Sequence, residues 1–177
     1  VMRLGILISG LAALAFTGFA AAESVLAPFA GQWVGKATVE TLGPTDFPNS
    51  VRDVGVTLTE DGAGGFKLEW STVKRESGDP ARPDEIASDT VVDFAPAGEG
   101  RWAASGGDPA KGQPLWYARI EDATLVVSGF AVTEDGKTEL QTYARTLQDG
   151  AMGLVYTRVV EGNVTRRASG ALTRFAP

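Results

Sequence analysis

Hydrophobic and polar residues alternate along most of the chain, and no long stretch has the three-to-four-residue spacing of an amphipathic helix. The alternation is clearest where Phe66, Leu68 and Trp70 are separated by charged residues. Since successive side chains of a β-strand point to opposite faces, this pattern predicts strands. We expect ten of them, at residues 33–41, 51–60, 65–74, 86–95, 100–105, 115–121, 124–133, 138–147, 152–161 and 164–174.

The segments between the predicted strands are mostly short and rich in Gly, Asp and Asn, which is typical of hairpin turns. Two longer segments, ESGDPARPDE and SGGDPAKGQP, contain several of the prolines. Strands joined in sequence order by tight turns predict an all-β fold, an up-and-down antiparallel β-barrel of about 8–10 strands. A sandwich of two sheets is the alternative. Residues 23–177 have the length of one domain.

The first 22 residues differ in character from the rest of the chain. Arg3 is followed by an apolar run from Leu4 to Phe19 and then by three alanines. This order is typical of a secretory signal peptide, so we expect residues 1–22 to be removed and the protein to be periplasmic or secreted. A membrane anchor is the alternative, but glycines interrupt the apolar run and no positive cluster follows it. The chain has no cysteine, so neither a cysteine-linked lipid anchor nor a disulfide is expected.

The composition narrows the possible chemistry. The chain has 16 Lys and Arg against 22 Asp and Glu, a net charge of −6, and no basic tract, which argues against a nucleic-acid partner. It has no histidine and no cysteine, so the commonest general base and the usual zinc and haem ligands are missing. We therefore expect no enzyme activity, no metal and no cofactor. The acidic residues Asp79, Asp84, Glu85 and Asp89 lack the spacing of a Ca²⁺ loop and are interpreted as a solvated loop.

The first predicted strand lies in FAGQWVGKA, which contains Gly31-x-Trp33-x-Gly35. This motif resembles the Gly-x-Trp at the start of lipocalins and related calycin barrels, including the nitrobindin-like branch. The resemblance implies that Trp33 plugs the closed end of a lipocalin-like barrel, and that an arginine of the last strand, here Arg174, stacks on it. Nitrobindin-like proteins bind haem through a histidine. This chain has none, so haem bound in that way is not expected.

The three tyrosines of the chain are each followed two residues later by an arginine: Tyr117 and Arg119, Tyr143 and Arg145, and Tyr156 and Arg158. Asp149-Gly150 is a strong signal for a two-residue turn, which places Tyr143 opposite Tyr156 in one hairpin. If Asp135-Gly136 forms the same kind of turn, Ser128 lies opposite Tyr143 in the preceding hairpin.

These registers divide the last strands into two faces. One face carries the tyrosines and arginines together with Val126, Ser128, Phe130, Gln141 and Leu154, and the other face carries no charge. If the tyrosine and arginine face points inward, it lines a wet cavity whose buried arginines need an anionic partner. If it points outward, the uncharged face forms the core, in line with the usual exposure of arginine. The sequence leaves both arrangements open.

Two functions fit these observations. The first is an exported protein that holds a small apolar or anionic, carboxylate-bearing ligand in the barrel cavity; its ligand-binding residues would be Tyr117, Arg119, Tyr143, Arg145, Tyr156 and Arg158. The second is a non-catalytic structural or interaction module of the cell envelope with a packed interior. An integral outer-membrane barrel fits less well, because the uncharged face is too small and polar for a lipid-facing band at Gly129, Ala131, Thr142, Ala144 and Thr146. After signal removal we expect no membrane-spanning segment.

Overall fold

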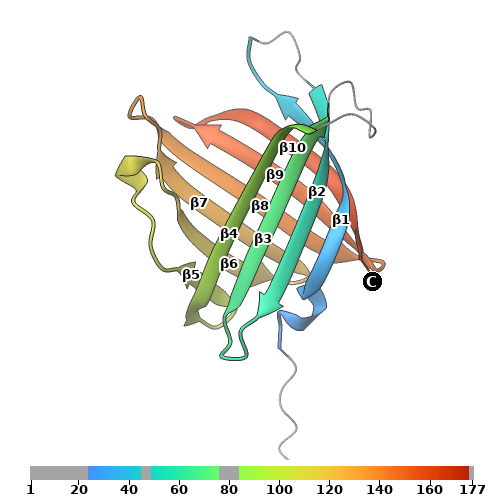
Figure 1. Cartoon of the computed structure of the whole chain (residues 1–177). Coiled ribbons are helices and arrows are strands. Elements are labelled where there is room, and N and C mark those ends of the chain that lie inside the picture. The colour runs from blue at the N-terminus through green and yellow to red at the C-terminus, as the bar shows by residue number, and fades with distance from the viewer. Residues whose placement is uncertain (1–23, 45–48, 76–83, 176–177) are drawn as a thin grey trace, which may run out of the picture.

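The computed structural model describes residues 24–44, 49–75 and 84–175, so the expected signal peptide at residues 1–22 lies outside the described residues. Ten strands in these ranges form a closed antiparallel barrel, accompanied by two short 3-10 helices (Figure 1). The strands are β1 (Gly31–Thr41), β2 (Asn49–Glu60), β3 (Phe66–Arg75), β4 (Asp84–Gly98), β5 (Arg101–Ala104), β6 (Leu115–Glu121), β7 (Thr124–Val132), β8 (Thr138–Gln148), β9 (Ala151–Val160) and β10 (Asn163–Arg174); the helices are η1 (Ala27–Phe29) and η3 (Pro109–Lys111).

Each strand pairs with the next one along the chain, and β1 pairs with β10 to close the barrel. The prediction of an all-β, up-and-down barrel is therefore confirmed, and the two-sheet sandwich is wrong. The predicted strands match the observed ones to within a few residues, and the largest difference is β4, which extends beyond 86–95 at both ends. None of the helices in the described ranges is long and apolar enough to cross a membrane.

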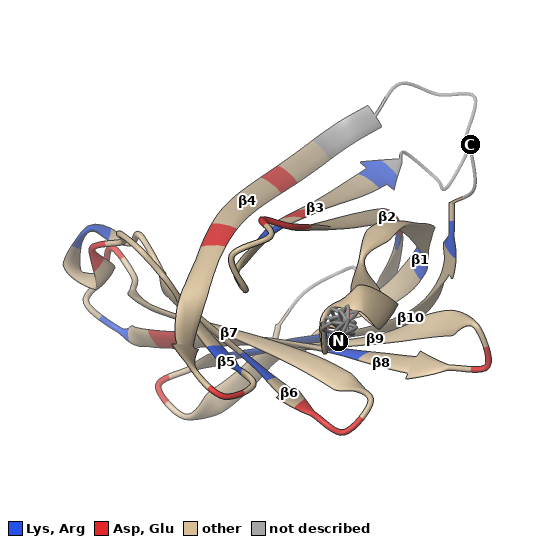
Figure 2. Ribbon diagram, turned by 90° about the horizontal axis from the view of Figure 1, so that it is seen from below, with Lys and Arg blue, Asp and Glu red and all other residues tan. Residues whose placement is uncertain are grey.

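One end of the barrel is closed by the chain around η1. Trp33 is almost fully buried there, and its indole N–H donates a hydrogen bond to the carbonyl of Phe29 at 2.9 Å. The guanidinium of Arg174 lies 4.4 Å from the centroid of the Trp33 ring. It also donates to the carbonyl oxygens of Ala30, at 2.5 Å, and of Pro28, at 2.8 Å. Figure 2 views the barrel from below, with the short coil of the N-terminal segment inside the ring of strands.

The hairpin of β8 and β9 has the register expected from its turn. Asp149 and Gly150 both have positive φ, 51° and 79°, as a tight two-residue turn requires. Tyr143 consequently pairs with Tyr156, and Gln141 pairs with Arg158. The predicted pairing of these two strands is confirmed.

The register predicted for β7 against β8 is wrong by one residue. Thr133 and Lys137 close a loop of residues 134–136, with the amide of Thr133 donating to the carbonyl of Lys137 at 2.8 Å, so Val127 and not Ser128 pairs with Tyr143. A shift of one residue exchanges the two faces of a strand. Leu125 and Val127 are therefore fully buried, whereas Phe130 is 40% exposed.

Candidate functional site

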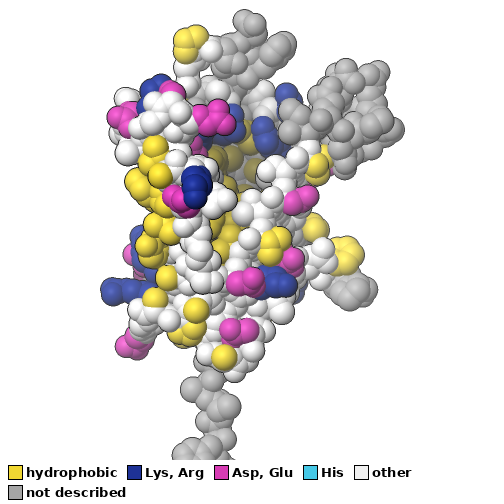
Figure 3. Space-filling model, turned by 60° about the vertical axis from the view of Figure 1, so that its left-hand side comes forward, with side chains coloured by type: hydrophobic (Ala, Val, Ile, Leu, Met, Phe, Trp, Pro, Cys, Tyr) yellow, Lys and Arg dark blue, Asp and Glu magenta, His cyan; other side chains and the backbone are white. Residues whose placement is uncertain are grey.

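A cavity of about 450 Å³ lies in the barrel toward the end away from Trp33. Figure 3 shows the upper part of the molecule hollowed between walls of side chains, with hydrophobic and basic groups inside. The cavity is lined by Ala37, Val39, Arg52, Val54, Trp70, Thr72, Ser88, Thr90, Pro114, Trp116, Glu139, Gln141, Tyr143, Leu154, Tyr156, Arg158, Arg166 and Ala168. The same cavity therefore has apolar side chains at its base and charged side chains in its upper part.

Four of the lining side chains, Trp70, Trp116, Tyr143 and Tyr156, form an aromatic cluster. Tyr143 contacts Tyr156 at 4.6 Å between ring centroids and Trp70 at 5.3 Å, and Trp70 meets Trp116 edge to face at 5.3 Å. Trp116 packs flat against the backbone of Gly129: a Cβ atom there would come within 2.5 Å of the indole. These interlocking rings form a rigid apolar wall with aromatic faces.

Arg145 lies behind this cluster, in the interior of the barrel. Its side chain is only 1% exposed, and its guanidinium carbon lies 5.2 Å from the ring centroid of Tyr143 and 5.5 Å from that of Trp70. Within the described part of the chain, its Nε and Nη1 atoms have no hydrogen-bond partner. Burial lowers the pKa of Arg145 to about 10. The arginine of the second Tyr-x-Arg pair thus points inward, but it does not line the cavity.

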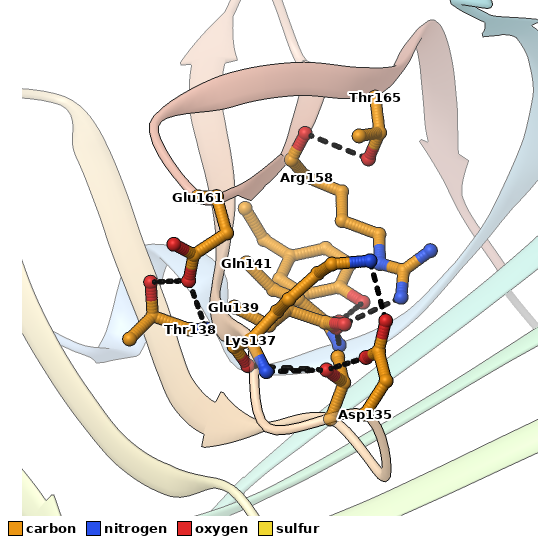
Figure 4. A network of polar contacts seen from close by, with 10 residues as sticks. Asp135, Lys137, Thr138, Glu139, Gln141, Arg158, Glu161 and Thr165 are labelled. Atoms are coloured by element: carbon orange, nitrogen blue, oxygen red, sulfur yellow. Dashed lines mark hydrogen bonds and ion pairs between the residues drawn. The ribbon is translucent and has the colours of Figure 1, made fainter.

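Above the aromatic cluster, a chain of hydrogen bonds joins β8 to β9. The hydroxyl of Tyr143 donates to the amide oxygen of Gln141 at 3.1 Å, and the Gln141 amide nitrogen donates to Glu139 at 2.7 Å. The other oxygen of Glu139 accepts a hydrogen bond from Arg158. Figure 4 shows Arg158 and Gln141 converging on this carboxylate. The hydrogen bond from Arg158 lowers the pKa of Glu139, with a smaller contribution from the charge of Arg166, so this carboxyl stays ionised.

Two further arginines of the lining, Arg52 on β2 and Arg166 on β10, are not paired in this way. Neither forms an ion pair with a described residue, and the Nε atom of each is buried without a hydrogen-bond partner in the described ranges. Burial lowers the pKa of Arg52, and the positive charge of Arg166 lowers it further. The two cations are therefore close enough to repel each other inside the cavity.

The structure brings together four of the six residues that the sequence suggested as ligand-binding. Tyr143, Tyr156 and Arg158 line the cavity, and Arg145 lies behind it. Tyr117 and Arg119 do not reach it: Tyr117 is 54% exposed, and Arg119 pairs on the outer surface with Glu121 at 2.6 Å. The reason is the alternation of β6, whose inward positions are taken by Trp116 and Ala118.

Arg52, Arg166 and Glu139 also line the cavity, although they were not expected there from the sequence. The sequence does contain a signal for Arg52. It alternates with Val54 and Val56 along one strand, so the three side chains point to the same face. Glu139 is likewise on the same face of its strand as Gln141 and Tyr143, because the three are alternate residues. The acidic loop interpreted as solvated includes Asp79, which lies outside the described residues, and no group of metal-ligating side chains occurs among those the structure describes.

No family model matches the chain, and no curated protein sequence is similar to it. Among solved structures, the crystal structure of a protein of unknown function from the DUF3598 family of Nostoc punctiforme is similar, with a TM-score of 0.54 and 17% sequence identity. The match covers 85% of this chain and 49% of that one, so the chain spans about half the length of its structural neighbour. The likeness is one of fold alone. It is consistent with a calycin-like barrel.

Proposed function

We propose that this protein binds an amphipathic small anion in the barrel cavity, with the apolar body of the ligand against the aromatic cluster and its anionic group at the arginines. The observation that carries the proposal is the charge of the lining. Among the described residues of the lining, Arg52, Arg158 and Arg166 face one carboxylate, Glu139, which gives that part of the cavity a formal balance of two positive charges in a chain of net charge −6.

The free-energy cost of placing charged side chains inside the barrel supports this proposal. A charge held without a partner inside a protein carries a desolvation cost, which is smaller for Arg52 and Arg166 than for a fully buried group because both side chains are only partly buried. A protein that needed only a stable barrel would fill these positions with apolar side chains. Arg52 and Arg166 therefore hold an anion-binding position, and the anion offsets their cost. Each charge-assisted hydrogen bond to such a group contributes about 1.5–3 kcal/mol.

The size and chemistry of the cavity agree with a small molecule. Ligand pockets usually have volumes of about 300–1,000 Å³, mostly apolar walls and a few polar anchors. Here the volume is about 450 Å³ and the apolar wall is the aromatic cluster, while the polar share of the lining, with Thr72, Ser88 and Thr90 beside the arginines, is larger than in most such pockets. A hollow, charged interior also favours ligand binding over the alternative of a structural module with a packed interior.

From residues 1–22 we also propose export, with action in the periplasm or outside the cell. Fractionation of cells expressing the full chain tests this separately. A shortened protein in the periplasm or medium supports it, and a full-length protein retained in the cytoplasm contradicts it.

Binding can be tested with naphthalenesulfonate, a planar aromatic monoanion, and naphthol, its neutral counterpart. Titration calorimetry of the wild type should show the sulfonate binding clearly tighter than naphthol. Replacing both Arg52 and Arg166 with Met should weaken sulfonate binding about tenfold or more, because the anchoring charges are lost.

Arg119→Met is the matched control, because it removes a positive charge from the outer surface and should leave the affinity unchanged. If the sulfonate and naphthol bind equally, or if the double variant binds like the wild type, the proposed function is wrong.

A further inference from the structure

Some charged side chains of the cavity are paired with an opposite charge, and others are not. Glu139 accepts one hydrogen bond on each of its oxygens, from Arg158 and from Gln141. Arg158 is held by this carboxylate. Two positive charges are left, those of Arg52 and Arg166, and neither forms an ion pair among the described residues.

These two arginines come from opposite sides of β1. Arg52 pairs with Ala37 in the β1–β2 ladder, and Arg166 pairs with Thr41 in the β1–β10 ladder. The lining residues between them are Val39 and Ala168, which pair with each other and offer no polar side-chain atom. Among the described residues of this wall, no polar side chain lies between the two charges, and Glu139 acts on Arg166 through its charge without forming an ion pair with it.

A single negative charge cannot neutralise two cations that already repel each other. A ligand with one charge would leave one partly buried guanidinium without a counterion, whereas a ligand with two charges would pair with both and offset their repulsion. Guanidinium groups suit this task, because each presents parallel N–H donors to the oxygens of a phosphate or carboxylate.

We infer that the anionic end of the ligand carries two negative charges and is bound between Arg52 and Arg166, as a phosphate monoester or a pair of neighbouring carboxylates would be. This inference rests on the proposed function and adds the charge class of the ligand. Arg158 and Glu139 form the adjoining rim of this position.

The test compares naphthyl phosphate with naphthalenesulfonate. Both carry a tetrahedral group with several oxygens on the same ring system, but the phosphate has two charges near pH 8 and the sulfonate has one. By calorimetry at pH 8, the phosphate should bind the wild type about tenfold tighter or more.

Near pH 5 the phosphate is mostly a monoanion, because its second pKa is about 6, so its advantage should disappear. The protein groups facing the ligand keep their charge over this range. The pKa of Glu139 is lowered and those of Tyr143 and Tyr156 are raised, so none of these groups changes its charge between pH 5 and pH 8.

Arg166→Met should abolish the preference for the phosphate over the sulfonate, because only one of the two cations then remains. Arg119→Met should preserve the preference. Adjacent naphthalene dicarboxylates form a third arm: tight binding of these but not of the phosphate assigns the two charges to two groups.

Equal affinities for sulfonate, phosphate and dicarboxylate at pH 8 would overturn this inference while leaving the proposed function intact. Failure of every anion to bind more tightly than naphthol would instead overturn the proposed function itself.

Discussion

Arg174 covers the indole of Trp33 and hydrogen-bonds the carbonyls of Pro28 and Ala30, and so links the last strand of the barrel to the segment that closes its end. Three interactions thus converge on one guanidinium. The two hydrogen bonds require its planar fork, and the ring contact requires its flat face.

Arg174→Met should therefore lower the free energy of unfolding by about 1–3 kcal/mol, measured by urea denaturation. Arg174→Lys should recover only part of this, because an ammonium group lacks the fork. Arg167→Met, which removes an exposed arginine of the same strand, serves as the control and should be nearly neutral. Equal stabilities of the Met and Lys variants would contradict the role given to the fork.

Removal of the buried charge at Arg145 should not destabilise the barrel. Burial lowers the pKa of Arg145 to about 10, well below its value in the unfolded chain, so the unfolded state holds the proton more tightly. Below pH 10 the charged side chain therefore opposes folding, by up to about 3 kcal/mol. The contacts of its guanidinium with the rings of Tyr143 and Trp70 offset part of this free-energy cost.

Arg145→Met should accordingly leave the free energy of unfolding unchanged or raise it by about 1–3 kcal/mol at pH 7. Thermal and urea unfolding measure this change directly. A loss of more than about 1 kcal/mol would mean that the ring contacts outweigh desolvation.

The ion pair of Glu139 and Arg158 predicts a dependence of stability on pH. The pKa of Glu139 is lowered in the folded state by the hydrogen bond from Arg158, so its contribution is complete above the unfolded pKa of about 4.3. It is lost as the pH falls through the lower folded value. Wild type should exceed Glu139→Gln in stability by about 1–2 kcal/mol at pH 7 and by much less at pH 3.

Urea denaturation at pH 7, 5 and 3 gives the comparison. Glu134→Gln, at an exposed loop position, should follow the wild type at every pH. An advantage over Glu139→Gln that stayed constant down to pH 3 would exclude the ion pair as its source.

Gly129 sets the position of Trp116 in the cavity wall. An added methyl group would lie 2.5 Å from the indole, so Gly129→Ala must displace the ring. We expect a loss of about 1–3 kcal/mol in stability and a shift in tryptophan fluorescence, with weaker binding of naphthalenesulfonate. Gly153→Ala is the matched control, because its new methyl would meet its nearest neighbour at an ordinary 3.7 Å. Similar behaviour of the two variants would contradict the close packing at Gly129.

The sequence predicted most of the fold because the turns are short and chemically distinct. Asp149-Gly150 determined the pairing of Tyr143 with Tyr156 correctly, since both turn positions need positive φ. Asp135-Gly136 led to a wrong register for the preceding hairpin. Only Gly136 has positive φ, and the loop has three residues instead of the expected two. A single sequence signal supports both loop lengths, and the packing of Leu125 and Val127 in the interior selects the observed one.

The site was predicted only in part, for a related reason. The repeated Tyr-x-Arg pattern is a local property, whereas the direction of each pair depends on the register of its strand. Tyr117 and Arg119 repeat the pattern and point outward. Arg52 and Arg166 belong to no Tyr-x-Arg pair and line the cavity, and only the closure of the barrel through β1 brings them together.

That closure also has a kinetic consequence. Most strand pairs are hairpins that neighbouring residues can form early, but the ladder of β1 with β10 joins Trp33 to Arg174 and requires most of the described chain to be in place. Contacts between such distant residues form late and slowly. Until they form, two strand edges stay open to aggregation, and the cavity lacks a wall. Ligand added during refolding should therefore stabilise the finished barrel without accelerating its assembly.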